Sequence, residues 1–156
     1  MEPKRWWGFD VKHVAAVALV VAGVGVAVRL SQGEAGFART FFVKLMNGNP
    51  AVEDAIDWEH LKAMEVDVGK TYTGLASDKE RADYRNTFLA SIAKGFQQTG
   101  ARTADFVHWR VHERADHRTV IAADYAKKRR TILLSFSDAA EKKKLTGIQW
   151  VVPPTS

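Results

Sequence analysis

The spacing of hydrophobic positions divides the chain into an apolar beginning and a patterned remainder. Residues 14–28 contain no charged or polar side chain, and their flanks extend the stretch to 11–30. About twenty helical residues rise ~30 Å, which matches the hydrocarbon core of a bilayer. We therefore predict a transmembrane helix over 11–30, with a short tail over 1–10 before it and a hinge over 31–35 after it.

After the hinge, hydrophobic residues recur at helical spacing. Phe37, Phe41 and Leu45 share one face of a predicted helix, which an Asn-Gly-Asn-Pro sequence ends. Pro50 suits the first position of a second amphipathic helix, which the pattern carries as far as Met64 either without interruption or with a break near Asp57. The sequence thus predicts two helices before residue 65.

The longest helix is predicted from its capping signals. Residues 68–75 contain two glycines and are expected to form a loop. Ser77 and Glu80 have the spacing of a capping box, in which a hydroxyl and a carboxylate each bond a free backbone N–H group. Apolar residues follow at four-residue intervals until Gly100, so this helix is expected to span about twenty residues.

From Thr103 onward the period of the pattern changes to two, which predicts strands. Their hairpin spacing predicts an antiparallel meander covered by the preceding helices. We expect Trp109 of the first strand to pack with Phe88 and Phe96 of the longest helix. Val107 and Val111 are expected to share the face of Trp109. The four predicted strands are 106–114, 118–125, 129–137 and 145–152.

This order of elements resembles a known family. About three helices followed by a curved four-stranded antiparallel sheet is similar to the cystatin-like, nuclear-transport-factor-like α+β fold, and the segments 41–58 and 84–96 look like its helical half. One span followed by such a domain also resembles assembly subunits of bacterial secretion systems. The resemblance implies an α+β domain over 36–152 with a tail over 153–156. It also implies an accessory or assembly subunit that acts by protein binding.

Composition and charge limit the alternatives. The chain has 156 residues, 23 Lys and Arg against 18 Asp and Glu, a net charge of +5 and no cysteine. This length suits one compact domain after the apolar stretch. The positive excess is too small to indicate nucleic-acid binding, and no disulfide can form.

The flanks of the apolar stretch predict the location of the protein. Lys4 and Arg5 precede the stretch, so an inside amino terminus and a periplasmic domain anchored in the inner membrane are expected. A cleaved signal peptide is the alternative, with a cleavage site at 33–35. The small residues of the stretch favour packing against another span. The predicted span-packing residues are Ala18, Ala22, Gly23 and Ala27, and the predicted interfacial anchors are Trp6, Trp7, Lys12 and Arg29.

Two kinds of chemistry were weighed against binding. A strand places His108 and His112 about 13 Å apart at ~3.3 Å per residue, too far to share one ion, so no metal site is predicted near them or near Glu113 and His117. Acid–base catalysis would need a carboxylate or histidine in an apolar pocket. That alternative, a tethered pocket for a small apolar ligand or an isomerase-like enzyme, would use groups such as Asp57, His60, Tyr72, Tyr84 and Asp124. No catalytic residue and no cofactor are predicted.

Basic residues gather at two predicted strand connections. Charged turns favour solubility and protect sheet edges, and near a bilayer they can also contact anionic lipid headgroups. The expected partners are the membrane, other subunits of a membrane complex, or a second copy of this chain, with no nucleic acid. The candidate basic contact surface comprises Lys127, Lys128, Arg129, Arg130, Lys142, Lys143 and Lys144.

Overall fold

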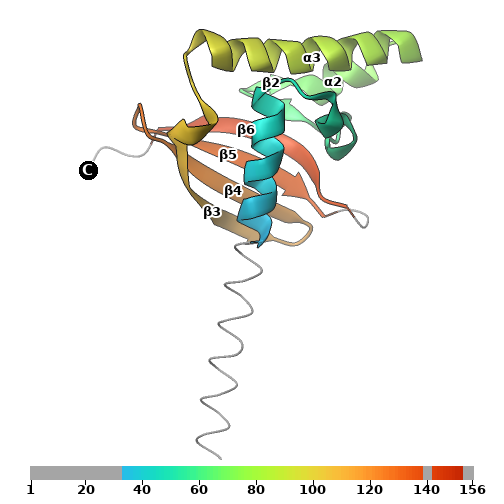
Figure 1. Ribbon diagram of the computed structural model, residues 1–156. Coiled ribbons are helices and arrows are strands. Elements are labelled where there is room, and N and C mark those ends of the chain that lie inside the picture. The colour runs from blue at the N-terminus through green and yellow to red at the C-terminus, as the bar shows by residue number, and fades with distance from the viewer. Residues whose placement is uncertain (1–32, 139–141, 153–156) are drawn as a thin grey trace, which may run out of the picture.

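The computed structural model describes residues 33–138 and 142–152. A six-stranded sheet in the order β2-β1-β6-β5-β4-β3 is crossed on one face by a helix at residues 33–46, and a longer helix runs along its upper border (Figure 1). The other elements are η1 (Pro50–Ala55), β1 (Lys62–Ala63), β2 (Val66–Asp67), α2 (Val68–Thr73), α3 (Asp78–Gln98), η2 (Thr103–Asp105), β3 (Phe106–Ala115), β4 (Arg118–Tyr125), β5 (Arg130–Ser137) and β6 (Lys144–Val151).

The sheet corrects the predicted fold class. Strands β3 to β6 pair antiparallel in chain order, but β1 joins β6 in parallel, with Lys62 opposite Gly147 and Ala63 opposite Ile148. The sheet is therefore mixed and six-stranded. The predicted α+β fold with a four-stranded antiparallel meander of the cystatin-like type is wrong.

The error arises between Pro50 and Met64, where a second amphipathic helix was expected. Only a short 3-10 helix forms, η1, and the chain then becomes extended because Ile56 bridges to Leu145 of β6. Ile56 and Leu61 are almost completely buried there. Their spacing satisfies a helix equally well, and strands of two residues carry no periodicity of their own.

The predicted loop over 68–75 is also wrong, because most of it forms α2. Asp67 caps this helix by accepting a hydrogen bond from the N–H of Lys70 at 2.9 Å. Gly69 lies inside the helix, where an added Cβ would stand 2.1 Å from the carbonyl oxygen of Glu59. This glycine therefore permits a close backbone approach and does not break the helix.

The predicted transmembrane helix over 11–30 lies outside the described residues, as do the tails over 1–10 and 153–156. Within 33–138 and 142–152, no helix is both long enough and apolar enough to cross a membrane. The predicted single-pass, signal-anchored architecture thus has no counterpart among these residues.

Helix α3 confirms the predicted capping box. The Ser77 hydroxyl accepts a hydrogen bond from the Glu80 N–H, and the Glu80 carboxylate accepts one from the Ser77 N–H, both at 3.2 Å. The helix ends at Gln98, and Gly100 follows with a φ of 65 degrees, a left-handed conformation that glycine adopts easily. The sequence therefore located both ends of this helix.

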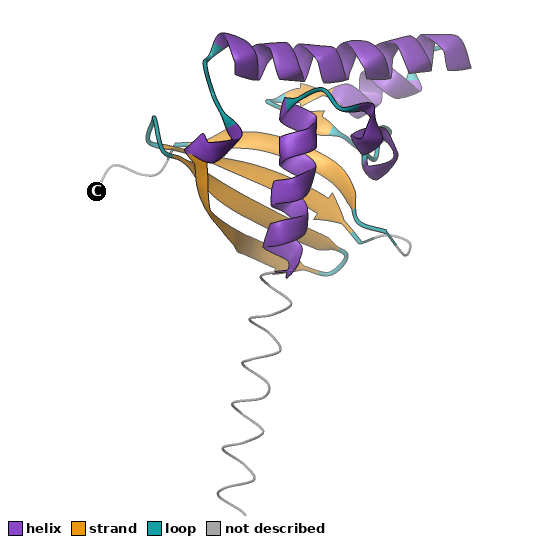
Figure 2. Ribbon diagram, in the orientation of Figure 1, coloured by secondary structure: helices purple, strands orange, loops and turns teal. Residues whose placement is uncertain are grey.

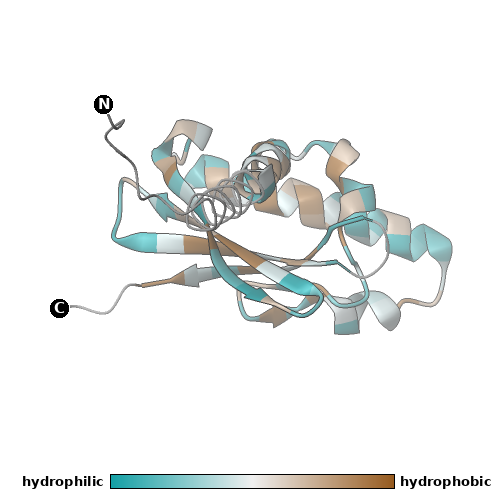
Figure 3. Cartoon of the chain, turned by 90° about the horizontal axis from the view of Figure 1, so that it is seen from below, coloured by the Kyte–Doolittle hydropathy of each residue, from teal (hydrophilic) through white to brown (hydrophobic). Residues whose placement is uncertain are grey.

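The core lies between the 33–46 helix and the inner face of the sheet (Figure 2). Phe42 is 1% exposed, and its ring meets Phe96, Phe106 and Trp109 with centroid distances of 4.7 to 5.5 Å. Figure 3 shows this helix end-on beside the sheet. The predicted packing is therefore corrected: Phe42 separates Phe96 from Trp109.

Phe88, the third member of the predicted cluster, lies elsewhere. Its ring packs edge-on against Trp58 at 5.5 Å, and the side chain is only partly buried. The buried side of α3 is formed by Leu89, Ala93 and Phe96. The four-residue spacing thus predicted a buried face that includes Phe88, whereas the face that is buried is rotated from it around the helix axis.

Strand β3 departs from regular alternation. Its register with β4 shifts between Val107 and Arg110 and again between Val111 and Glu113, and His108 has a φ of 53 degrees. Each bulge places an extra residue in the strand and changes which face the next side chain occupies. Val107 consequently pairs with Asp124 on the outer face, whereas it was expected beside Trp109.

Candidate functional site

The interior contains aromatic and aliphatic side chains in contact with one another. Phe106 stacks on Tyr125 at 5.1 Å, and Tyr125 meets Trp150 at 5.9 Å. Among the described residues, the buried polar or charged positions are Asp105 and Thr119. A reaction inside an apolar pocket would need a carboxylate or histidine facing open space, and this core presents neither.

The structure brings together two pairs of the acid–base candidates. His60 Nδ1 lies 3.0 Å from Asp57 Oδ1, but the His60 side chain is 73% exposed. Tyr72 and Tyr84 have ring centroids 6.3 Å apart, and the Tyr72 hydroxyl accepts a hydrogen bond from Arg85 at 2.8 Å. These pairs lie at the surface and in a packed aromatic cluster, respectively.

The remaining candidate, Asp124, belongs to the outer face of the sheet. Arg110 donates a hydrogen bond to each of its carboxylate oxygens at 3.0 Å, and Thr131 donates another at 3.0 Å. The hydrogen bond from Arg110 lowers the pKa of Asp124; burial opposes this shift and Thr131 supports it. Asp124 is therefore an ionised partner that holds Arg110 in place.

The histidines weighed as metal ligands are dispersed. His108 Nδ1 lies 3.3 Å from Asp124, whereas Glu113 accepts a hydrogen bond from Arg118 at 2.7 Å. His112 is exposed on β3, and His117 occupies the following turn with a φ of 60 degrees. In the described part of the chain, no group of three His, Cys, Asp or Glu side chains could hold a metal ion.

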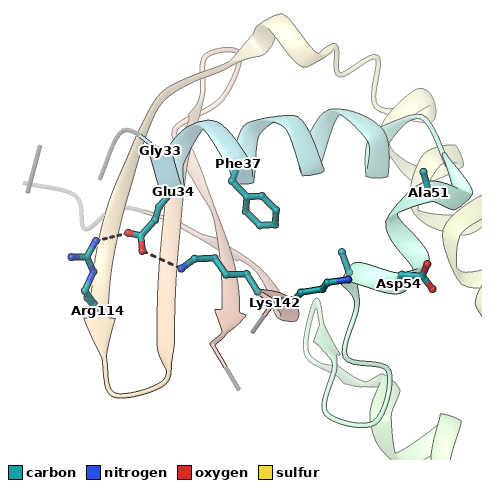
Figure 4. Close-up of a pocket in the computed structure, with 9 residues that line it drawn as sticks. Gly33, Glu34, Phe37, Ala51, Asp54, Arg114 and Lys142 are labelled. Carbon is teal, nitrogen blue, oxygen red and sulfur yellow. Dashed lines mark hydrogen bonds and ion pairs between the residues drawn. The ribbon is translucent and has the colours of Figure 1, made fainter. Parts of the chain in front are cut away.

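A surface groove lies where the 33–46 helix begins. It has a volume of about 710 Å³, and Phe37, Ala51 and Ala55 supply its apolar lining. Figure 4 shows the Phe37 ring directed into this space, with Ala51 on the far side. The Phe37 side chain is 39% exposed although it rests edge-on against Phe136 at 5.4 Å. We call this hollow the Phe37 groove.

An ion-pair network closes one end of the Phe37 groove. Glu34 binds Arg114 and also accepts a hydrogen bond from Lys143 Nζ at 3.0 Å (Figure 4). Lys143 lies 3.0 Å from Asp138 as well. Burial favours the neutral amine, but the hydrogen bonds to Asp138 and Glu34 outweigh it and raise the pKa of Lys143. Lys143 is therefore used within the fold, and Lys142 and Lys144 remain exposed beside it.

The second basic cluster is divided in the same way. Lys127 Nζ lies 2.8 Å from Asp105 Oδ2 and donates to the carbonyl of Gly100 at 3.0 Å. The next three residues, Lys128, Arg129 and Arg130, are exposed and line a separate hollow of about 460 Å³. In the described ranges, these three side chains form no ion pair.

Sequence reasoning reached some of these residues and missed others. The basic clusters were found from composition, but their division depends on Asp105 and Glu34, which are distant in sequence. Helical spacing placed Phe37 on one face with Phe41, but the structure leaves Phe37 exposed while Phe41 is buried. The predicted span-packing residues and interfacial anchors lie outside the described residues: Ala18, Ala22, Gly23, Ala27, Trp6, Trp7, Lys12 and Arg29.

In comparisons with known proteins, no protein-family model, no curated protein and no solved structure matches this chain.

Proposed function

We propose that this protein is an accessory or assembly subunit that acts by binding another protein through the domain over 33–152. The observation that carries the proposal is the contrast between a filled interior and an apolar groove on the surface. The rings of Phe42, Phe106 and Tyr125 occupy the space that an internal ligand would need. The Phe37 groove instead offers apolar surface from outside.

The Phe37 groove has the properties of a protein-binding surface. Partly exposed aromatic side chains in a hollow are frequent sites of strong binding energy in protein interfaces. Phe37 is held from below by Phe136 and Phe41, so its exposed edge is presented with little loss of side-chain entropy on binding. Glu34, Arg114 and Lys143 form a polar rim at one end. An apolar side chain of a partner would fit between them and Ala51.

The alternative, a pocket for a small apolar ligand, is not favoured by a specific observation. Asp105 is the one buried carboxylate of the described residues, and Lys127 and the N–H of Arg102 already occupy Oδ2. The extracytoplasmic location of the domain stays a prediction from sequence.

The test is co-purification of the full chain, tagged after Ser156, from its cell of origin under gentle extraction. We expect proteins in a fixed ratio to the tagged chain. Ala51→Glu places a charge in the Phe37 groove, where Ala51 is exposed at the start of η1, and should remove those partners. Ala90→Glu adds the same charge on the exposed side of α3 and should retain them.

Two results would contradict the proposal. One is a parent protein that elutes as the chain alone after every extraction. The other is native mass spectrometry that detects a retained small apolar molecule, because such a molecule would indicate an internal site.

A further inference from the structure

We propose that the hollow beside the β4–β5 turn binds a short acidic segment of a partner protein, with carboxylates against its basic wall and an apolar side chain on its floor. This inference rests on the proposed function and names the chemistry of one contact. The hollow, called the basic hollow below, lies on the outer face of the sheet, so it is separate from the Phe37 groove. Its residues are Arg110, His112, Asp124, Tyr125, Lys128, Arg129, Arg130, Thr131, Leu133 and Val151.

Cationic side chains outnumber carboxylates in the described lining of the basic hollow. Four cationic side chains line it against the single carboxylate of Asp124, which gives a net charge of +3 with His112 neutral. The carboxylate of Asp124 already accepts hydrogen bonds from both terminal nitrogens of Arg110. Lys128, Arg129 and Arg130 are exposed and pair with no carboxylate among residues 33–138 and 142–152.

The turn is held in a fixed position by Lys127. Its ion pair with Asp105 and its hydrogen bond to Gly100 attach the start of the turn to η2 and to the end of α3. The N–H of Lys128 also donates to the carbonyl of Tyr125 at 3.2 Å. One residue of the basic run therefore positions the turn, and the next three form its surface.

Arg110 is already engaged by the fold, through Asp124 and the carbonyl of His108, so it contributes charge to the hollow, and the arginines of the turn are the directional binding groups. Asp124 accepts two hydrogen bonds from Arg110 and so fixes the plane of the guanidinium on the sheet face. Arginine binds carboxylates through planar, paired hydrogen bonds that a flexible lysine cannot reproduce. Two further arginines, Arg129 and Arg130, stand on the neighbouring turn, so more than one carboxylate could be bound.

The floor and size favour a peptide over a larger polyanion. Leu133 and Val151 contribute apolar side chains to the lining, and Val151 pairs with Thr131 across β5 and β6. A volume of about 460 Å³ accommodates a few side chains, within the range of ~300–1,000 Å³ for ligand sites. Phosphates of a nucleic acid or a membrane would gain nothing from the apolar side chains of Leu133 and Val151.

The first test measures binding of two synthetic peptides to the full chain by fluorescence anisotropy. One is an acidic peptide with a central leucine, and the other has serine in place of that leucine. We expect the leucine peptide to bind more tightly, and its affinity to fall as salt is added because exposed charges are screened.

The variant Lys128→Gln/Arg129→Gln/Arg130→Gln should lower the affinity for the leucine peptide by at least about tenfold. This is the loss expected for one strong charged contact. The matched control is Lys44→Gln/Lys79→Gln/Lys94→Gln, which removes the same charge from exposed helix positions and should bind like the parent. Circular dichroism melting should be the same for parent and both variants, since all six side chains are exposed.

Equal binding by the two triple variants would overturn the inference, and so would equal affinity for the two peptides. Tighter binding to anionic vesicles or to single-stranded DNA than to the leucine peptide would indicate a general polyanion surface and would also overturn it. Co-purification separates this failure from failure of the proposed function. If the variant of residues 128–130 keeps every co-purifying protein, only the inference about the basic hollow is contradicted. If the parent protein co-purifies with no protein, the proposed function is contradicted.

Discussion

Lys127 and Asp105 form an ion pair between the β4–β5 turn and the short helix before β3, with Nζ 2.8 Å from Oδ2. Asp105 is buried, and its other contact is the N–H of Arg102 at 2.8 Å. The Lys127 hydrogen bond is the main cause, and the Arg102 N–H the second, of a pKa of Asp105 below its ordinary value. The pair joins two segments that are 22 positions apart in sequence.

This ion pair predicts a dependence of stability on pH. A carboxyl group whose pKa is lowered by folding stabilises the folded state above its unfolded pKa, near 4, and this contribution is lost as the pH falls through the folded value. Asp105→Asn removes the charge but keeps an oxygen for the Arg102 N–H. We expect its melting temperature to lie below that of the parent at pH 7 and to approach it in acid. A gap that is unchanged on acidification would show that the charge contributes nothing.

A second prediction concerns the core. Phe42 is almost completely buried among three aromatic rings, so Phe42→Ala should lower the free energy of unfolding by about 3–5 kcal/mol. Phe88→Ala should cost less, because the Phe88 side chain is only partly buried against Trp58. Urea unfolding of both variants measures the order. A larger loss of unfolding free energy for Phe88→Ala than for Phe42→Ala would contradict this assignment of the core.

A third prediction compares two glycines in helices. At Gly95 in α3 an added Cβ meets no atom within 4 Å, so Gly95→Ala should stabilise the protein by about 0.5–1 kcal/mol. At Gly69 in α2 the Cβ would stand 2.1 Å from a backbone oxygen of Glu59. Gly69→Ala should therefore lower the melting temperature, although both substitutions favour helix formation locally. Differential scanning calorimetry should give shifts of opposite sign.

A fourth prediction concerns the turn between β1 and β2. Met64 and Glu65 have φ values of 49 and 71 degrees, which strain residues other than glycine. Glu65 is exposed, so Glu65→Gly changes little except the backbone and should stabilise the protein by up to about 1 kcal/mol. The exposed Glu59 allows the control Glu59→Gly, which should not stabilise. Equal melting temperatures for the parent and Glu65→Gly would argue against strain in this turn.

The sequence predicted those elements whose signals are local. Strands β3 to β6 lie within a residue of their predicted bounds, and the Ser77 capping box starts α3 where expected. By contrast, β1 joins the main sheet through β6, where Lys62 and Ala63 meet partners more than eighty positions later. No local pattern distinguishes such residues from a helix, and the fold class was wrong for this reason.

The candidate site shows the same limit. Composition identified the basic run at Lys127, but the ion pair with Asp105 that separates this residue from Lys128 could not be seen in sequence. The β3 bulges that move Val107 to the outer face could not be predicted either, because apolar and polar residues alternate in the sequence of β3 without interruption. Helical spacing also grouped Phe37 with Phe41 and Leu45, although Phe37 is exposed and the other two are buried.

The parallel pairing of β1 with β6 has a consequence for the order of synthesis. The backbone partners that join the segment after η1 to β6 lie between Leu145 and Ile148, near the carboxyl end of the chain. The residues that they pair with are Ile56, Lys62 and Ala63. A growing chain produces its amino-terminal part first, at ~5–20 residues per second. The segment after η1 therefore spends several seconds without its neighbour, with apolar side chains uncovered. During this interval a nascent chain halted before Leu145 would be a target for chaperones and proteases, whereas the finished chain would not.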